Sequence, residues 1–430
     1  MGAKITGVTT GVRGASLGDI AERLVRYCAI ASPSSPDGAG AVPSTPSQHA
    51  MAALLGRELE ELGAEDVSVD AHAYVTAHWP ASPGCEGLPR LGLCAHLDTA
   101  WQAVGDPVRP RVVRYGGGPL VMGEVDGETV AVTPEEEPVL LGLAGTDVVV
   151  TDGTSLLGGD DKAGIAEIMA YLERLAADPA IPHPPLAVAF VPDEEVGHGA
   201  SLLDIDAWGA AWAFTLDTGP LGEVTLETFN ACDAFVEARG RAVHTGWAKG
   251  VLVNACEALA AFHGLLPAAE RPEHTEGREG FYHLVSMEGE CERARAHYIV
   301  RDHDRAGFER RRDVMAAACD HVNRAMGAGT LSVSFRDTYR NMGEEVGRHP
   351  ELLEAAFGAF RDVGVEPSAV PMRGGTDGAQ LTFRGLPCPN LSAGYHLAHS
   401  RREFVPVREM EVMVDVLEHL GRRLGSPPGG

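Results

Sequence analysis

The sequence predicts an α/β protein in which a sheet-based domain is interrupted by a smaller α+β domain. Three short apolar segments, at residues 90–95, 186–191 and 211–216, have the length and composition of buried strands. Each is followed directly by histidine or carboxylate side chains, which is typical of an open α/β sheet with its functional groups at the carboxyl ends of the strands. Residues 229–340 instead alternate strand-like and helical stretches, which predicts an inserted domain.

The other elements are predicted from apolar spacing and from turn residues. Helices are expected at residues 19–28 and 47–62 and after residue 164, where a glycine-rich turn with an acidic pair ends. In the insertion we expect strands at 234–239, 295–300 and 331–335 and helices at 254–264 and 307–326. After it we expect a helix at 352–362, a strand at 386–391 and a closing helix at 408–424. Residues 1–14 form a loose arm or an extra edge segment in this interpretation, and residues 425–430 should fray.

Composition and charge exclude several classes of partner. The 430 residues include 35 Lys and Arg against 61 Asp and Glu, a formal net charge of -26 that repels nucleic-acid phosphates and anionic membrane surfaces. No segment approaches the ~18 consecutive apolar residues of a membrane helix, and no signal sequence is evident, so the expected compartment is the cytoplasm. The eight cysteines include no C-x-x-C pair, which predicts reduced core residues and no disulfides.

Potential ligands for a hard metal ion gather at the predicted strand ends and turns. They are His96, Asp98, Asp160, Asp161, Glu194, Glu195, Asp217 and His399. If these mostly anionic groups converge, two divalent cations are the natural way to offset their repulsion, and two metals can together activate a water and polarise a carbonyl. Asp98 is placed to accept the second ring N–H of a metal-bound His96. Each short pattern is weak alone, and their joint order along the chain carries the prediction.

That order resembles the tripeptide aminopeptidases of the peptidase T family, a branch of the co-catalytic zinc metallopeptidases. The resemblance runs from about residue 16 to residue 424. It includes the longer segments TEGREGFYHL at residues 275–284 and RGGTDGA at residues 373–379, which distinguish peptidase T from its relatives. The implied fold has a catalytic domain at residues 1–228 and 341–430, with a central mixed sheet flanked by helices. The implied insertion at residues 229–340 is a lid and dimerisation domain.

The resemblance also implies roles for single residues. His96, Asp160 and Asp217 would hold one zinc ion, and Asp160, Glu195 and His399 the other, with Asp160 as the bridge. Glu194 would be the general base acting on a metal-bridging water, and Asp98 would orient His96. The Asp160–Asp161 peptide bond is expected to be cis. Cobalt or manganese could replace zinc, because carboxylate and imidazole ligands suit all three metals.

Three further residues are implied to contact the substrate. His244 would stabilise the tetrahedral oxyanion, and Arg301 and Arg373 would bind the substrate carboxylate through planar guanidinium forks. Thr245, Trp247 and the segment at residues 218–220 depart from the usual pattern of the family.

The leading hypothesis is a zinc aminopeptidase that releases the N-terminal residue of short peptides, most often tripeptides, and that forms a homodimer. The alternatives are a related amidohydrolase acting on dipeptides or N-acylated amino acids, and a non-catalytic, metal-dependent peptide-binding protein. The presence of Glu194 argues against the non-catalytic protein. Nucleotide binding is disfavoured because the glycine run at residues 116–118 lacks a P-loop lysine.

Overall fold

The computed structural model describes residues 19–38 and 40–425, so the expectations for residues 1–14 and 426–430 lie outside the described residues. The chain divides into two compact units. The first takes in the chain up to Leu226, then Glu345–Val370 and the chain from Thr376 onwards; the second contains Glu227–Glu344 and Pro371–Gly375. Each unit has its own hydrophobic core.

The prediction placed residues 1–228 and 341–430 in the catalytic domain, but the second unit takes in residues 227–228, residues 341–344 and one further segment. Residues 371–375 lie with the second unit. Met372 N–H donates to the carbonyl oxygen of Glu227 at 3.0 Å, and the Arg373 guanidinium donates to carbonyls of residues 275–279. The predicted role of the second unit as a lid and dimerisation domain stays a prediction.

The first unit is built on an eight-stranded mixed sheet. In sheet order its strands are β1 (Glu65–Val69), β2 (Val75–Trp79), β8 (Leu186–Val191), β3 (Leu91–His96), β9 (Trp212–Thr218), β16 (Asn390–Ser392), β10 (Glu223–Glu227) and β15 (Ser368–Pro371). The central strands β8, β3, β9 and β16 are parallel, while β1, β2 and β10 pair antiparallel with their neighbours. The three predicted apolar strands are therefore adjacent in the middle of the sheet.

Helices cover both faces of this sheet, which explains why β3 and β8 are buried at every position and, apart from the terminal His96 of β3, carry no polar side chain. Leu186, Val188 and Phe190 of β8 join the larger core, while the alternate residues Ala187 and Ala189 join a smaller core on the other face. The larger core is formed with α1 (Ile20–Cys28), α2 (Gln48–Leu62), α3 (Gly159–Ala177), α8 (Pro350–Asp362) and α10 (Val407–Leu424). The smaller core is formed with α4 (Ile205–Trp208) and α9 (Asp377–Phe383).

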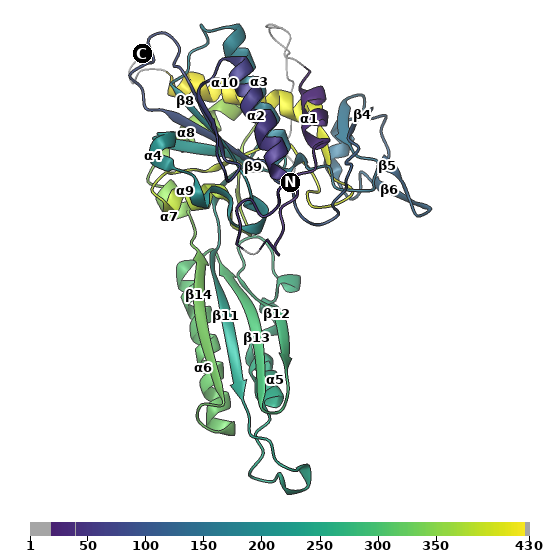
Figure 1. Cartoon of the computed structure of the whole chain (residues 1–430), viewed down its shortest axis with the longest axis vertical. Helices are drawn as coiled ribbons and strands as arrows, with labels where there is room; N and C mark the ends of the chain where they lie inside the picture. The colour runs from purple at the N-terminus through teal and green to yellow at the C-terminus, as the bar shows by residue number, and fades with distance from the viewer. Residues whose placement is uncertain (1–18, 39, 426–430) are drawn as a thin grey trace. The chain divides into compact units, whose positions relative to one another are not determined.

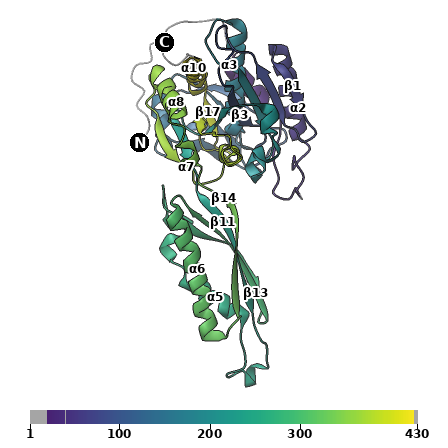
Figure 2. The ribbon, with the colours of Figure 1, turned by 90° about the vertical axis from the view of Figure 1, so that its left-hand side faces the viewer.

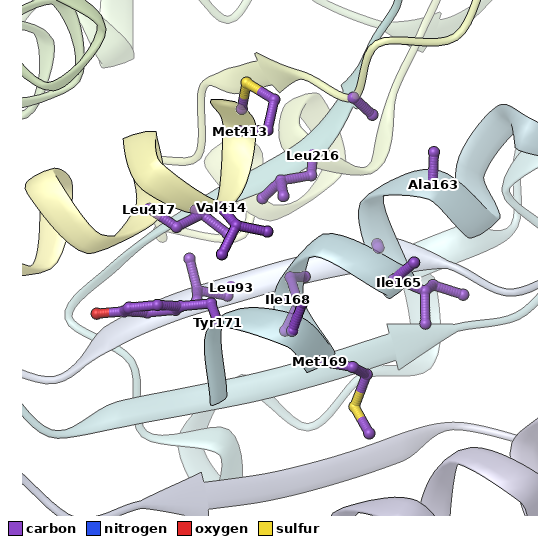
Figure 3. Packing of buried hydrophobic residues seen from close by; sticks show 14 of the residues in the cluster. Leu93, Ala163, Ile165, Ile168, Met169, Tyr171, Leu216, Met413, Val414 and Leu417 are labelled. Atoms are coloured by element: carbon purple, nitrogen blue, oxygen red, sulfur yellow. The ribbon is translucent and has the colours of Figure 1, made fainter. Parts of the chain in front are cut away.

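Helix α3 is the central helix of the larger core and packs against β3, β9, α1 and α10. Figure 3 shows its side chains meeting those of the sheet and of α10, with Ile165, Ile168, Tyr171, Leu93, Leu216, Val414 and Leu417 among the labelled residues. The contact is close: a Cβ on Gly164 would lie 2.3 Å from the backbone oxygen of Leu216 in β9. A glycine here lets the start of α3 approach β9, which fixes the acidic pair beside the sheet edge.

The chain between β3 and α3 forms small sheets that the sequence did not predict. Its strands β7 (Asp147–Val150) and β4 (Arg111–Arg114) form a three-stranded sheet with β17 (Phe404–Pro406) from the C-terminal part of the chain. Its strands β5 (Leu120–Val125) and β6 (Glu128–Val132) form a hairpin (Figure 1). The predicted strand at 386–391 is also wrong in its bounds, since only Asn390–Ser392 is strand. Pro387 and Pro389 lack the N–H that a strand donates.

The second unit is an antiparallel four-stranded sheet with two helices on one face (Figure 2). Its strands, in sheet order, are β12 (Phe281–Gly289), β13 (Arg293–Asp302), β11 (Asn230–Arg239) and β14 (Leu331–Tyr339). The helices α5 (Ala255–Leu265) and α6 (Arg305–Met326) supply the apolar side chains that cover the sheet. The short helix α7 (Gly343–Val346) lies where the chain passes from the second unit back to the first.

Candidate metal centre

The sheet order brings predicted ligands together. His96 is the last residue of β3, Glu194 and Glu195 follow β8, and Asp217 lies near the end of β9. Strands β8, β3 and β9 are adjacent and parallel, so their carboxyl ends lie at one edge of the sheet. This is the edge at which an α/β sheet collects its functional side chains.

Asp160 reaches the same edge from the start of α3. Asp160 and Asp161 have non-helical backbone angles, and the peptide bond between them is cis, as the family resemblance implied. Before them, Gly158 has φ +77°, and a Cβ there would lie 2.7 Å from Cγ2 of Thr99. The regular turns of α3 therefore begin after the acidic pair, and both carboxylates are free to point away from the helix axis.

Five side chains form two groups that share Asp160. One is His96, Asp160 and Asp217, the other is Asp160, Glu195 and His399, and in each the ligand atoms lie within 4.8 Å of one another. Asp160 Oδ1 lies 2.9 Å from His96 Nε2, and Asp160 Oδ2 lies 3.1 Å from His399 Nε2. The two oxygens of one carboxylate thus face two different histidines.

The donor set fits a pair of divalent metal ions. Imidazole nitrogens and carboxylate oxygens are the ligands that zinc, cobalt and manganese accept. Glu195 Oε1 is buried without a hydrogen-bond partner among the described residues, although His399 Nε2 lies 2.9 Å away. Three carboxylates within such short distances repel one another, and cations are the simplest way to offset that repulsion.

The pKa values reflect this crowding. Burial raises the pKa of Glu195 to about 7, and burial followed by the charge of Asp217 raises the pKa of Glu194 well above its usual range. His96 is buried, which disfavours its charged form, but hydrogen bonds with Asp160, Asp217 and Asp98 outweigh burial and raise its pKa. Burial thus disfavours the ionised form of these glutamates, while the neighbouring carboxylates favour a charged His96.

Asp98 connects the first histidine to the predicted base. His96 Nδ1 lies 3.1 Å from the backbone carbonyl oxygen of Asp98 and 3.3 Å from its Oδ1, and the two carboxylate oxygens accept the backbone N–H groups of Glu194 at 3.0 Å and Glu195 at 3.3 Å. One fully buried carboxylate therefore fixes both the ring of His96 and the turn after β8.

Several supporting residues were not found by sequence reasoning. Glu403 accepts the N–H groups of Leu157, Gly158 and Asp160 at 2.8–2.9 Å and so shapes the segment before α3. Tyr395 Oη donates to Asp217 Oδ1 at 3.3 Å. Glu403 lies 243 residues from Asp160, so no local pattern could have shown the contact.

A second support lies behind Glu194. Gln48 donates from Nε2 to Asp193 Oδ1 at 2.6 Å and accepts the Asp193 N–H at 3.2 Å. Ser44 donates to the same carboxylate through its N–H and its hydroxyl, both at 2.6 Å. Asp193 has φ +58°, so these bonds hold a left-handed residue directly before the predicted base.

The predicted substrate residues His244, Arg301 and Arg373 all belong to the second unit. His244 is exposed between β11 and α5; its Nδ1 accepts the Gly246 N–H at 3.1 Å, and its ring lies 4.6 Å from that of Trp247. Arg301 and Arg373 line one pocket of about 350 Å³. The rest of that lining is Pro272, Phe281, His283, Ile299, Tyr339 and Gly374.

The similarity to known proteins decides the family. A model of peptidase family M20/M25/M40 matches residues 147–423. A peptidase T of Shouchella clausii is 42% identical over 402 residues, which cover 94% of this chain and 97% of that protein. A peptidase T of Edwardsiella ictaluri is 44% identical over 403 residues, which cover 93% and 96% of the two chains. The chain belongs to the peptidase T branch of family M20/M25/M40.

Solved structures confirm the α/β fold class of this peptidase T family member. The aminopeptidase PepT from Bacillus cereus has a TM-score of 0.75 at 21% identity and covers 96% of this chain and 99% of its own. A dinuclear metal binding peptidase of the M20 family from Bacillus subtilis has a TM-score of 0.62 at 13% identity, covering 94% and 98%.

Two other expectations can be compared with the structure of this peptidase T relative. All eight cysteines lie among the described residues and are free; six are buried, as expected of core residues, while Cys256 and Cys291 are partly exposed. Within residues 19–38 and 40–425, no helix has the length and apolar character needed to cross a membrane.

Proposed function

We propose that the chain is a metal-dependent aminopeptidase that releases the N-terminal residue of tripeptides. The observation that carries the proposal is the shared Asp160 carboxylate, whose two oxygens face His96 and His399 at 2.9 and 3.1 Å. Relatives more than 40% identical over nearly the whole chain are named peptidase T, and a more distant structural neighbour is described as a tripeptidase. Together these support a dinuclear peptidase site in this chain.

The two ligand groups would hold two zinc ions, with cobalt or manganese as substitutes. His96, Asp160 and Asp217 would bind the first, and Asp160, Glu195 and His399 the second. Such cations, when bound, lower the pKa of a water, polarise the peptide carbonyl and keep the neighbouring carboxylates ionised.

Glu194 would act as the general base. It would take a proton from the attacking water and later deliver it to the amine that leaves. Asp98 would hold this turn in place through the backbone N–H groups of Glu194 and Glu195, because it accepts both. Because the backbone of Glu194 is already held in place, little conformational entropy of the base is lost on reaching the transition state.

Residues of the second unit would bind the rest of the substrate. His244 would donate from Nε2 to the developing oxyanion, since its Nδ1 already accepts the Gly246 N–H. The pocket with Arg301 and Arg373 would receive the carboxylate at the far end of the tripeptide. A strongly acidic chain needs local positive charge to hold such an anion. Homodimer formation stays a prediction.

The test is amine release from an unblocked tripeptide and from its N-acetylated form, with zinc-loaded protein. We expect cleavage of the free peptide alone. Glu194→Gln should lower kcat by about 10²–10⁴-fold, because a positioned general base contributes that much, and metal content should stay unchanged. A preference for the acetylated peptide would move the chain to the acylases, and no turnover of either substrate by fully metallated protein would refute the proposal.

A further inference from the structure

The chain that follows the proposed base folds back onto the turn that carries it. A single turn of 3₁₀ helix begins at Glu194, and the Gly197 N–H donates to the Glu194 carbonyl oxygen at 2.7 Å. The N–H groups of His198 and Gly199 both donate to the carbonyl oxygen of Asp193, at 2.9 and 3.0 Å. The place of Gly199 and the place of the turn are therefore tied together by backbone hydrogen bonds.

A buried carboxylate from helix α9 lies directly against this segment. Asp377, the first residue of α9, is 1% exposed, and its Oδ1 accepts the N–H of Ala200 at 2.6 Å. A Cβ on Gly199 would lie 1.7 Å from Asp377 Oδ1 and 2.9 Å from Oδ2. The carboxylate thus fills the space that any side chain at position 199 would need.

The two glycines of the segment have different reasons to be glycine. Gly197 has φ +78°, a backbone conformation that residues with a side chain rarely adopt. Gly199 does not have a positive φ, so its backbone conformation is open to other residues. The three atoms nearest to a Cβ at Gly199 all belong to Asp377, which makes the close approach of this carboxylate the reason for the glycine.

Two more side chains of the α9 region bind the same segment. Gln380 Nε2 donates to the Gly197 carbonyl oxygen at 3.2 Å, and Arg384 donates to the Ala200 carbonyl oxygen. Asp377, Gln380 and Arg384 are three and four residues apart, so they lie on one side of the helix. Of the three, Asp377 is the one that contacts Gly199, which is bonded to Asp193.

We infer that Asp377 is a positioning residue for the general base: its carboxylate fixes Gly199 and Ala200 and, through them, the turn that presents Glu194. It acts through contact and a hydrogen bond to the backbone, so the shape of its side chain should matter more than its charge. This inference rests on the proposed role of Glu194.

The first test is hydrolysis of an unblocked tripeptide by Asp377→Ala. We expect kcat to fall by about ten- to a hundredfold, because a hydrogen bond to a charged group is lost, with KM and zinc content unchanged. Asp377→Asn keeps an oxygen that can accept the Ala200 N–H, so its kcat should stay within about fivefold of the wild type. The control Asp204→Ala removes a carboxylate that accepts the Ala207 N–H at an exposed position, and should leave kcat unchanged.

A double-mutant cycle tests the contact itself. Gly199→Ala should lower kcat in the wild-type chain, because the new Cβ collides with the carboxylate. In the Asp377→Ala background the same change should cost less than about twofold, since the space is then empty. Effects that multiply, an unchanged kcat in Asp377→Ala, or zinc lost in step with activity would each overturn the inference. If Asp377→Ala does not fold, Gly199→Ala with full zinc and unchanged kcat would overturn it.

Failure of the proposed function has a different signature, because the wild type itself would then cleave no tripeptide. The hold of Asp377 on the turn is in that case measured by hydrogen exchange over residues 193–200. Exchange there should be faster in Asp377→Ala than in the wild type or Asp204→Ala. Equal exchange in the three proteins would overturn the positioning role.

Discussion

The two units of the chain present opposite charge at the places where chemistry is expected. In the first unit, four carboxylates gather around two histidines at the edge of a buried sheet, counting Asp98 with the three metal-group carboxylates. In the second unit, two arginines line a pocket on an open sheet face and a connecting loop. The first is suited to cations, and the second to an anion.

The two sites are also built differently. In the first unit, buried carboxylates such as Asp98 and Glu403 accept backbone N–H groups, so their charge fixes the main chain around the ligands. In the second unit, backbone carbonyls accept from the arginines, so the main chain fixes the charged side chains. A side chain whose donors are filled is part of the framework, and one with donors left over can bind a ligand.

Removal of the metals from the carboxylate-rich site of the first unit should have the largest effect on activity and stability. After treatment with a chelator we expect activity to be lost and the melting temperature to fall, because the clustered carboxylates repel one another and bound cations stabilise the folded state. Zinc, cobalt or manganese should restore both, with two ions per chain by elemental analysis. Arg301→Met should keep the full metal content, and activity that persists in metal-free protein would contradict the assignment of the site.

Glu403→Gln tests whether a carboxylate behind the ligands matters. An amide keeps the shape but loses the charge that attracts three N–H groups, one of them from Asp160. We expect metal affinity to fall by about 10–100-fold, as for other supports of metal ligands. The matched control is Glu60→Gln at an exposed position of helix α2, which should leave metal affinity unchanged. Equal affinities in the two variants would rule out the supporting role.

Gln48→Ala tests the support of the base without touching a ligand. It removes the donor to Asp193 and the acceptor of its N–H, which together hold the residue before Glu194. A hydrogen bond to a charged group is worth about 1.5–3 kcal/mol, so kcat should fall by about tenfold or more, with little change in KM. Gln102→Ala, at an exposed position, serves as the control. A change in KM alone would point to a different role.

Glu167 in α3 is a carboxylate of the first unit without such support. Both its oxygens are buried and have no hydrogen-bond partner among the described residues, and burial, followed by the charge of Glu409, raises its pKa well above the usual range. Below the pKa of the unfolded chain both states are protonated. As pH rises, the unfolded state ionises first, so stability falls by up to about 1.4 kcal/mol per pH unit until the folded pKa is reached.

Glu167→Gln should remove this contribution to the pH dependence. The variant should match the wild type near pH 4 and be more stable at pH 8, as measured by urea unfolding at several pH values. An unchanged slope of stability against pH would show that Glu167 is ionised in the folded protein.

The same contrast explains what could be predicted from the sequence. Strands β3 and β8 are contiguous apolar runs because both sheet faces are covered, and the ligands lie directly after them, so local patterns indicated both the strands and the order of the ligands. The small strands β4 to β6 are half exposed and lack such runs, so they were not predicted. Gln48 and Glu403 lie 145 and 243 residues from the groups they hold, and no local pattern encodes those contacts.

The position of His399 and Glu403 has a consequence for the synthesis of the protein. The turn between β16 and α10 supplies His399, the last of the proposed ligands, and also the carboxylate that holds Asp160. A ribosome makes the chain from its N-terminus, so every other ligand is already present while this turn is still missing. A chain that ends before this turn therefore lacks part of the proposed site, and we expect hydrolysis of peptides to begin only after Glu403 has been made.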